Sequence, residues 1–130
     1  MTRTMEITID GKRYRFYLRC WDTRSGFAHG AEMFDCESYR IVAEEKCYYL
    51  NRTWECWTYQ TAILGAISKA MVNIVSAVEA KVRAENGWKN ITKKRRAVLN
   101  EALDNNDEMV RLRKLYEELH KSRPAWDYFS

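Results

Sequence analysis

The chain has 130 residues, of which 31% are charged, and a formal net charge of +4 at pH 7. This length supports one domain with a hydrophobic core, residues 1–130, and the mildly basic charge permits nucleic-acid binding without requiring it. Residues 1–10 lack the apolar run of a secretory signal, and Lys69 and several polar residues interrupt the longest apolar stretch. The composition therefore favours a cytoplasmic protein and argues against a membrane span.

The first part of the chain, residues 1–52, alternates apolar and polar side chains with the period of β-strands. The first alternation ends at Asp10-Gly11, a dipeptide that favours a type I′ turn because both of its residues accept positive φ angles. Residues 12–21 form the returning strand. Two more strands, residues 27–36 and 39–50, complete a predicted four-stranded antiparallel meander.

The predicted strand 12–21 has an apolar side that faces the core and an outward side of arginine and aromatic residues. The outward side consists of Arg13, Arg15, Tyr17, Arg19 and Trp21. Alternating arginine and aromatic side chains are typical of surfaces on which bases stack, and also of protein-binding hot spots. In a structural alternative, the C-terminal helices cover this side, or its arginines pair with acidic residues of other strands: Glu32, Glu44 or Glu45.

The last two predicted strands have less regular patterns. Gly30 indicates a bulge or a close approach of another group to the backbone. In the strand 39–50, Glu45 falls on the apolar side, so we expect a β-bulge near Glu44-Glu45. The other residues predicted to share that side are Tyr39, Ile41, Ala43, Cys47 and Tyr49.

A long helix is predicted over residues 53–86, which contain no proline and only one glycine, Gly65. Its apolar residues follow three- and four-residue steps along two adjacent stripes, so we expect the sheet on one side and other helices on the other. A helix of this length would span about 50 Å, so either its end projects or it breaks near Gly65. Asn51 or Thr53 would cap its start, and Asn86-Gly87 would end it.

Residues 90–121 predict two shorter helices. The first covers residues 93–103, and Asp104-Asn105-Asn106 would end it and cap the second, residues 107–121. The remaining residues, 122–130, form an aromatic tail that either folds back onto the domain or contacts a partner. Together these elements predict an α+β fold, in which a four-stranded antiparallel meander packs on one long helix and two shorter helices follow.

The predicted helix 93–103 has Asn90 or Thr92 as its cap and four adjacent basic residues in its first turn. These residues are Lys93, Lys94, Arg95 and Arg96. The helix dipole disfavours positive charge at this position, so the cluster suggests an anionic partner, either a phosphate backbone or an acidic protein surface. The structural alternative is a solvated helix start that Glu101 and Asp104 balance.

The sequence contains no signature of a catalytic, metal or cofactor site. The four cysteines include no Cys-x-x-Cys pair, and without an export signal free thiols are favoured over two disulfides. His29 and His120 lie far apart in the sequence, and neither has a neighbouring Asp, Ser or Cys at a telling spacing. Cys20 and Cys36 flank His29 in the sequence, so a Cys-His pair is conceivable, but its spacing does not indicate one. We therefore expect a non-enzymatic protein.

The predicted junction between sheet and long helix reads KCYYLNRTWE over residues 46–55, followed by YQTA over residues 59–62. It resembles a junction in small proteins of phages and prophages of Gram-positive bacteria, where a strand ending in aromatic residues passes through Asn-Arg-Thr-Trp-Glu into a helix. Residues 26–29 and the Asp-Gly hairpin have similar placements. The resemblance implies no site residue, but it implies a phage setting in which small non-enzymatic proteins antagonise host defence, including CRISPR nucleases.

The expected function is therefore protein binding, as an anti-CRISPR inhibitor of a host RNA-guided nuclease. The alternative is a nucleic-acid-binding accessory or regulatory protein that uses the outward side of the strand 12–21 and residues 93–96. Because the long helix has two apolar stripes, we also expect self-association as a homodimer.

Overall fold

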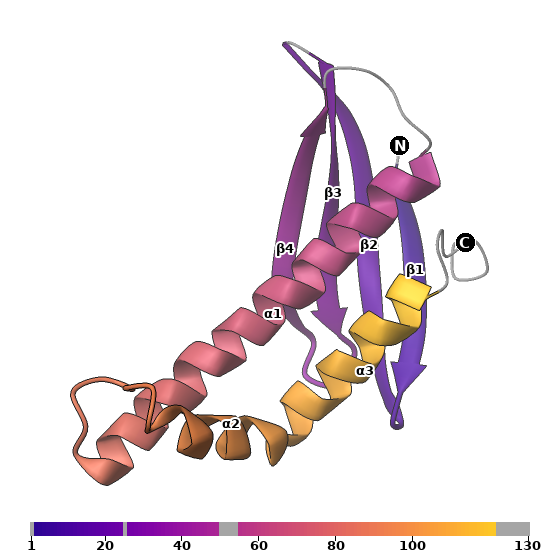
Figure 1. The fold of residues 1–130 in the computed structure, drawn as a ribbon. Helices are drawn as coiled ribbons and strands as arrows, with labels where there is room; N and C mark the ends of the chain where they lie inside the picture. Colours follow the sequence, from indigo (N-terminus) through magenta and orange to yellow (C-terminus); the bar gives the residue numbers. More distant parts are fainter. Residues whose placement is uncertain (1, 25, 50–54, 122–130) are drawn as a thin grey trace.

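The computed structural model describes residues 2–24, 26–49 and 55–121, without the side chains of residues 2, 49 and 55–58. Four strands form one antiparallel sheet in the order β1-β2-β3-β4, and α1 and α3 lie against the same face of it (Figure 1). This arrangement confirms the predicted α+β fold with a meander sheet. The elements are β1 (Thr2–Ile9), β2 (Lys12–Thr23), β3 (Gly26–Asp35), β4 (Arg40–Tyr49), α1 (Glu55–Asn86), α2 (Arg96–Asp104) and α3 (Asp107–Lys121).

The first hairpin has the turn that its sequence predicts. Ile9 pairs with Lys12, so the loop consists of Asp10 and Gly11 alone. Their φ angles are 51° and 78°, and positive values at both central positions define the type I′ turn. The twist of this turn matches that of the flanking strands, which fixes the register of β1 on β2.

The core lies between the sheet and the helix layer. From the sheet it receives the fully buried side chains of alternate β2 residues and of Met33 on β3. From the helices it receives Ile63 and Ile67 of α1 and Leu112 and Leu115 of α3. Each such side chain contributes about 1.5 to 3 kcal/mol when it leaves water, so this layer holds the sheet against the helices. The β2 residues are Tyr14, Phe16 and Leu18.

The predicted bulge lies at another residue. The pairing of β3 with β4 shifts between Met33, which faces Ala43, and Phe34, which faces Ile41, so Val42 is the extra residue. One inserted residue reverses the side to which the neighbouring side chains point. The prediction that Tyr39 and Ile41 share the core side is therefore wrong, because they are 80% and 60% exposed.

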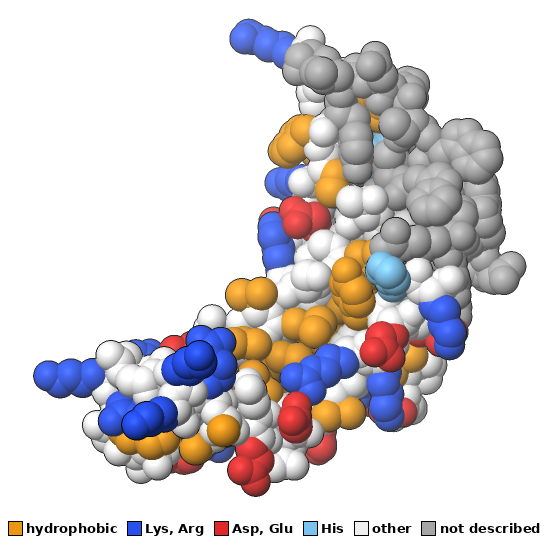
Figure 2. All heavy atoms as spheres, in the orientation of Figure 1, with side chains coloured by type: hydrophobic (Ala, Val, Ile, Leu, Met, Phe, Trp, Pro, Cys, Tyr) orange, Lys and Arg blue, Asp and Glu red, His pale blue; other side chains and the backbone are white. Residues whose placement is uncertain are grey.

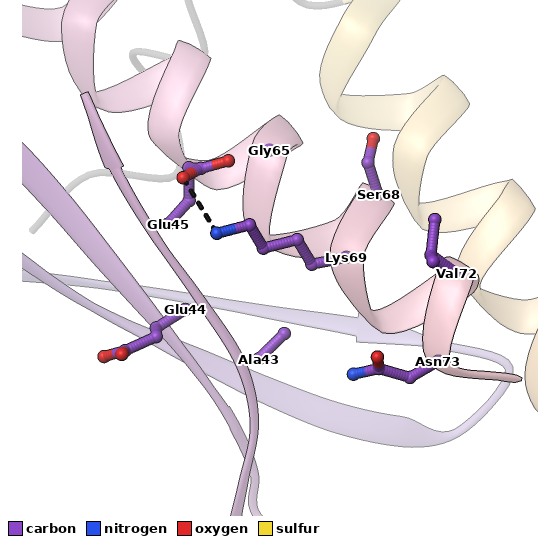
Figure 3. A pocket seen from close by; sticks show the side chains of 8 residues that line it. All are labelled: Ala43, Glu44, Glu45, Gly65, Ser68, Lys69, Val72 and Asn73. Atoms are coloured by element: carbon purple, nitrogen blue, oxygen red, sulfur yellow. Dashed lines mark ion pairs between the residues drawn. The ribbon is translucent and has the colours of Figure 1, made fainter. Parts of the chain in front are cut away.

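Glu45, expected to be accommodated by a bulge, instead lies in regular register opposite Ala31. Its side chain faces α1 and occupies a notch above Gly65, where an added Cβ would lie 2.7 Å from Glu45 Cγ. Its carboxylate pairs with Lys69 Nζ at 3.1 Å, as Figure 3 shows. Because Gly65 has no side chain and Lys69 lies one turn later, α1 accommodates an acidic residue on the helix-facing side of the sheet.

Helix α1 runs without a break through Gly65, so its far end projects beyond the sheet (Figure 1). Beyond the sheet it packs on α2 through a small second core. Gly87, with φ of 66°, ends the helix, and the Trp88 N–H donates to the Arg83 carbonyl at 2.9 Å. This is the Schellman arrangement expected of Asn86-Gly87. The second core consists of Leu99, Leu103 and Met109 with Met71, Ile74, Val75, Val78 and Ile91.

Composition does not exclude a membrane span, contrary to the expectation from Lys69 and the polar residues. The segment Tyr59–Asn86 is long and apolar enough to cross a membrane by length and composition, although only 33% of its most apolar window is buried. A core helix of a soluble protein meets the same criterion. Here Ala66, Ile67 and Ala70 of this segment are buried in the packed core.

The C-terminal helices differ in how well their starts were predicted. Helix α2 begins at Arg96 rather than Lys93, and Arg95 is its N-cap without a side-chain hydrogen bond, so the predicted caps Asn90 and Thr92 are wrong. Adjacent positive charges disfavour the first turn of a helix, which explains the later start. Helix α3 begins as expected, because Asn106 Oδ1 accepts the N–H of Met109 at 2.9 Å. The predicted caps of α1 and the aromatic tail lie outside the described residues.

Candidate interaction surfaces

The two described long helices cover one face of the sheet, which leaves the opposite face, here called the open face, without a described helix on it (Figure 1). The outward side of β2 lies on the open face as predicted, because the alternate residues Tyr14, Phe16 and Leu18 are buried on the other. The structural alternative that the C-terminal helices cover this side is therefore wrong for the described residues.

The arginines of β2 pair across the sheet, but with another partner than expected. Arg15 Nη2 lies 2.9 Å from Glu6 of β1, and Arg13 Nε lies 3.3 Å from the same carboxylate. The β1–β2 register, which places Glu6 opposite Arg15, decides this choice over acidic residues of β3 and β4. Arg15 also donates to the Tyr17 hydroxyl at 3.4 Å. The single carboxylate of Glu6 therefore offsets one of the three arginine charges on β2 within the sheet.

Aromatic rings form a layer of two contact groups on the open face. Trp21 lies over Gly30, where an added Cβ would be 3.1 Å from the indole ring. Trp21 meets Tyr48 edge to face at 6.4 Å, and the Arg19 guanidinium lies 5.9 Å from the Trp21 ring. Gly30 is therefore a close approach and not a bulge, which resolves the two predicted alternatives.

Strands β3 and β4 also contribute to this layer, which the sequence did not predict. Phe34 meets Tyr17 at 6.0 Å and Tyr39 at 6.4 Å, and both contacts are edge to face. Tyr48 is 67% exposed and Ile41 lies further along the same edge. Strict alternation placed Tyr39 and Ile41 in the core, and no signal in the sequence marked the bulge at Val42 that turns them outward.

A second surface lies at the end of the molecule where α1 ends and α2 begins, residues 81–101, here called the basic tip. Lysine and arginine side chains gather there (Figure 2). Residues 93–95 form a turn that leads into α2, and Lys93, Lys94 and Arg96 are exposed. Arg95 instead lies over the Trp88 ring at 4.7 Å and donates to the Asn90 carbonyl at 3.4 Å. Of the four predicted residues, Arg95 therefore has a structural role in the loop.

The structure keeps the two predicted sets of site residues apart. The open face is built from the strands, whereas the basic tip lies beyond the sheet at the far end of α1 (Figure 1). A small molecule or a short peptide would not contact both sets at once. No family model, no curated protein and no solved structure matches this chain. The function must therefore be argued from these surfaces.

A shallow groove runs between α1 and the edge strand β4, with a volume of about 480 Å³ (Figure 3). The Glu45 carboxylate reaches across the groove to the ammonium of Lys69 and also accepts the backbone N–H of Lys46 at 2.9 Å. An unpaired N–H at a sheet edge invites pairing with another strand, so this carboxylate protects the edge. The groove is therefore a weaker candidate than the open face.

His29 occupies a packed position. It is 3% exposed and lies edge to face against Phe27 at 5.7 Å and Tyr59 at 4.8 Å. The strand registers place Cys20 and Cys47 opposite His29, rather than the Cys20 and Cys36 considered from the sequence. The described cysteines Cys20, Cys36 and Cys47 are free thiols, and the described residues contain no cluster of three His, Cys, Asp or Glu suited to a metal ion.

A polar cluster joins the strands β2 and β3 to α3. Lys12 Nζ lies 2.9 Å from Asp35 and 3.2 Å from Glu108, and the Tyr14 hydroxyl donates to Glu108 at 3.0 Å. Arg111 also pairs with Glu108. Burial raises the pKa of Tyr14 to about 12. Burial also opposes ionisation of Asp35, but the bond from Lys12 and two backbone N–H groups outweigh it and lower the pKa of Asp35 below 3.8. The satisfied partners indicate that this cluster anchors α3.

Proposed function

We propose that this chain is a non-enzymatic protein that binds a protein partner through the open face of its sheet. The observation that carries the proposal is the layer of rings and arginines on that face. A sheet face that meets only water is usually polar, whereas this one exposes Tyr48, Ile41 and Tyr39 at 67%, 60% and 80%. Tryptophan, tyrosine and arginine are also the residues that dominate binding hot spots in protein interfaces.

The charges of the open face favour a protein over bare nucleic acid as its partner. Glu6 pairs with Arg13 and Arg15 and offsets one of their two charges, and Glu32 and Glu44 add negative charge on the same face. The rings also meet one another edge to face, whereas single-stranded nucleic acid needs flat ring surfaces open to its bases. A partner with an apolar patch opposite Tyr48 and Ile41 and a carboxylate opposite Arg19 fits this chemistry.

We further propose that the partner belongs to a host defence system and is an RNA-guided nuclease. The support for this step is the resemblance of residues 46–55 and 59–62 to small phage and prophage proteins. Such a partner works in the bacterial cytoplasm, where the free thiols of Cys20, Cys36 and Cys47 would stay reduced. Inhibition would follow from occupying a groove on the nuclease, with no chemical step.

The experiment measures DNA cleavage by purified RNA-guided nucleases of Gram-positive bacteria with and without this chain, and binding to the inhibited nuclease. In the test variant, Trp21→Ala and Tyr48→Ala together remove the ring pair of the open face. Hot-spot residues of this kind cost about 2 kcal/mol, so Kd should rise about 30-fold.

The matched control removes two exposed apolar side chains from the helices, Val72→Ala and Val98→Ala, which are 60% and 43% exposed. This control should inhibit as the unmodified chain does. Equal inhibition by the open-face variant would overturn the role of this face. If the unmodified chain inhibited no nuclease, the proposed partner class would be wrong. Binding of the open face to other proteins would then be tested separately.

A further inference from the structure

We propose that the basic tip is a second binding site, separate from the open face, that takes the phosphate backbone of nucleic acid. Its candidate contacts are Lys89, Lys93, Lys94 and Arg96. The proposal does not depend on the partner of the open face. It rests on how charge is distributed in the chain and on how few of these cations have acidic partners.

The net positive charge of the whole chain comes from this one end. Residues 81–101 contain seven basic and two acidic residues, a net charge of +5, whereas the chain as a whole carries +4. All other residues together therefore carry −1. Figure 2 shows the cations grouped where α1 gives way to α2. A single-sign cluster on a projecting end attracts a polyanion and concentrates it locally.

Four cations of the basic tip lack, within the described part of the chain, the acidic partners that many basic residues of the sheet and α3 have. On the sheet and α3, basic side chains such as Lys12, Arg15 and Lys114 form ion pairs at 2.9 Å. Lys89, Lys93, Lys94 and Arg96 form no ion pair with any described residue, and all four are exposed. These four positive charges are therefore available to bind an external anion.

Helix stability does not account for these charges. The first turn of α2 has no acidic residue and its N-cap makes no side-chain hydrogen bond, so nothing described there offsets the basic residues that precede and begin the helix. Cations near a helix N-terminus are unfavourable, because they oppose the positive end of the helix dipole. Helix α3 has Asp107 and Glu108 in the equivalent place. The same chain thus follows the stabilising pattern in one helix and reverses it in the other.

A phosphate backbone fits the basic tip better than a lipid surface. Binding to a membrane surface needs apolar side chains that insert beside the cations. The one large apolar side chain exposed at the described tip is Val98, at 43%, and Arg95 lies over the ring of Trp88. Cation contacts without base contacts predict binding that ignores nucleotide sequence.

The test titrates the full chain against a fluorescein-labelled 20-base-pair DNA duplex, and against one of its strands, at 50 to 200 mM KCl. Four phosphate contacts predict that duplex affinity falls about 100-fold over this fourfold change in salt. The test variant is Lys93→Glu with Lys94→Glu, and the matched control, Arg24→Glu with Lys121→Glu, changes two exposed cations outside the basic tip by the same total charge. The test variant should bind at least about tenfold more weakly at 50 mM KCl, and its salt slope should fall by about two.

Thermal melting supplies a readout that a structural role would move in the opposite direction. Because glutamate is favoured near a helix N-terminus, the test variant should melt at the same temperature as the unmodified chain or about 2 °C higher. Equal loss of affinity in the control would overturn the site, as would undetectable duplex and single-strand binding by the unmodified chain at 50 mM KCl. Tighter binding to vesicles with 30% phosphatidylserine, or to an acidic peptide, than to DNA would also overturn it.

Discussion

The contact between Gly65 and Glu45 gives the sharpest test of the fold. In an exposed or neutral helix position, Gly→Ala stabilises by about 1 kcal/mol, because alanine loses less backbone entropy. Here the new Cβ would lie 2.7 Å from Glu45 Cγ and 2.9 Å from Oε2, so the carboxylate must leave its notch. The sign of the effect therefore depends on what Glu45 loses when it moves.

The loss is estimated from two contacts of Glu45 and the rotamer strain of its displaced side chain. The ion pair with Lys69, whose side chain is 56% exposed, contributes about 0.5 kcal/mol. The hydrogen bond from the Lys46 N–H at 2.9 Å contributes about 1 kcal/mol. A displaced side chain adds about 0.5 kcal/mol of rotamer strain. The total of about 2 kcal/mol exceeds the helix gain, so Gly65→Ala should destabilise by about 1 kcal/mol.

A double-mutant cycle isolates this coupling, with the free energy of unfolding measured by urea titration followed by circular dichroism. In a Glu45→Ala background the notch is empty, so Gly65→Ala should stabilise the protein by about 1 kcal/mol. The coupling between the two positions is then about 2 kcal/mol. If Gly65→Ala stabilised equally in both backgrounds, Glu45 would not occupy the notch and the placement of β4 on α1 would be wrong.

Three further predictions each concern the substitution of one residue. Asn106→Ala, which removes the cap of α3, should lower the free energy of unfolding by about 1 kcal/mol, and an unchanged value would contradict the cap. Leu115→Ala, at a fully buried position, should cost about 3 kcal/mol against less than about 0.5 kcal/mol for the exposed Val72→Ala. Because the pKa of Asp35 is lowered in the folded protein, its contribution to stability is present above about pH 4 and is lost as the pH falls through the lowered value. Asp35→Asn, which removes the charge opposite Lys12, should therefore lower the free energy of unfolding by about 2 kcal/mol at pH 7. It should also flatten the fall in stability between about pH 5 and pH 2, measured by urea titration. An unchanged fall over this pH range would contradict the role of Asp35.

The features that the sequence determined by itself are those decided by a few adjacent residues. Asp10-Gly11 specified a hairpin because its backbone accepts the two positive φ angles of the turn. Asn106 specified the start of α3, and Gly87 the end of α1, because each satisfies orphan backbone groups within one turn of the chain. The alternation in β2 separated a buried side from an arginine and aromatic side, so half of the open face was visible in advance.

Tertiary structure decided what depends on residues far apart in the chain. The bulge at Val42 placed Tyr39 and Ile41 on the outside, because the pairing of β4 with β3 overrides strict alternation. Glu45 could face the helix layer only because α1 presents Gly65 and Lys69 at that level. The separation of the open face from the basic tip was likewise set by the packing of α1, since periodicity gives the faces of a helix but not which neighbour covers each one.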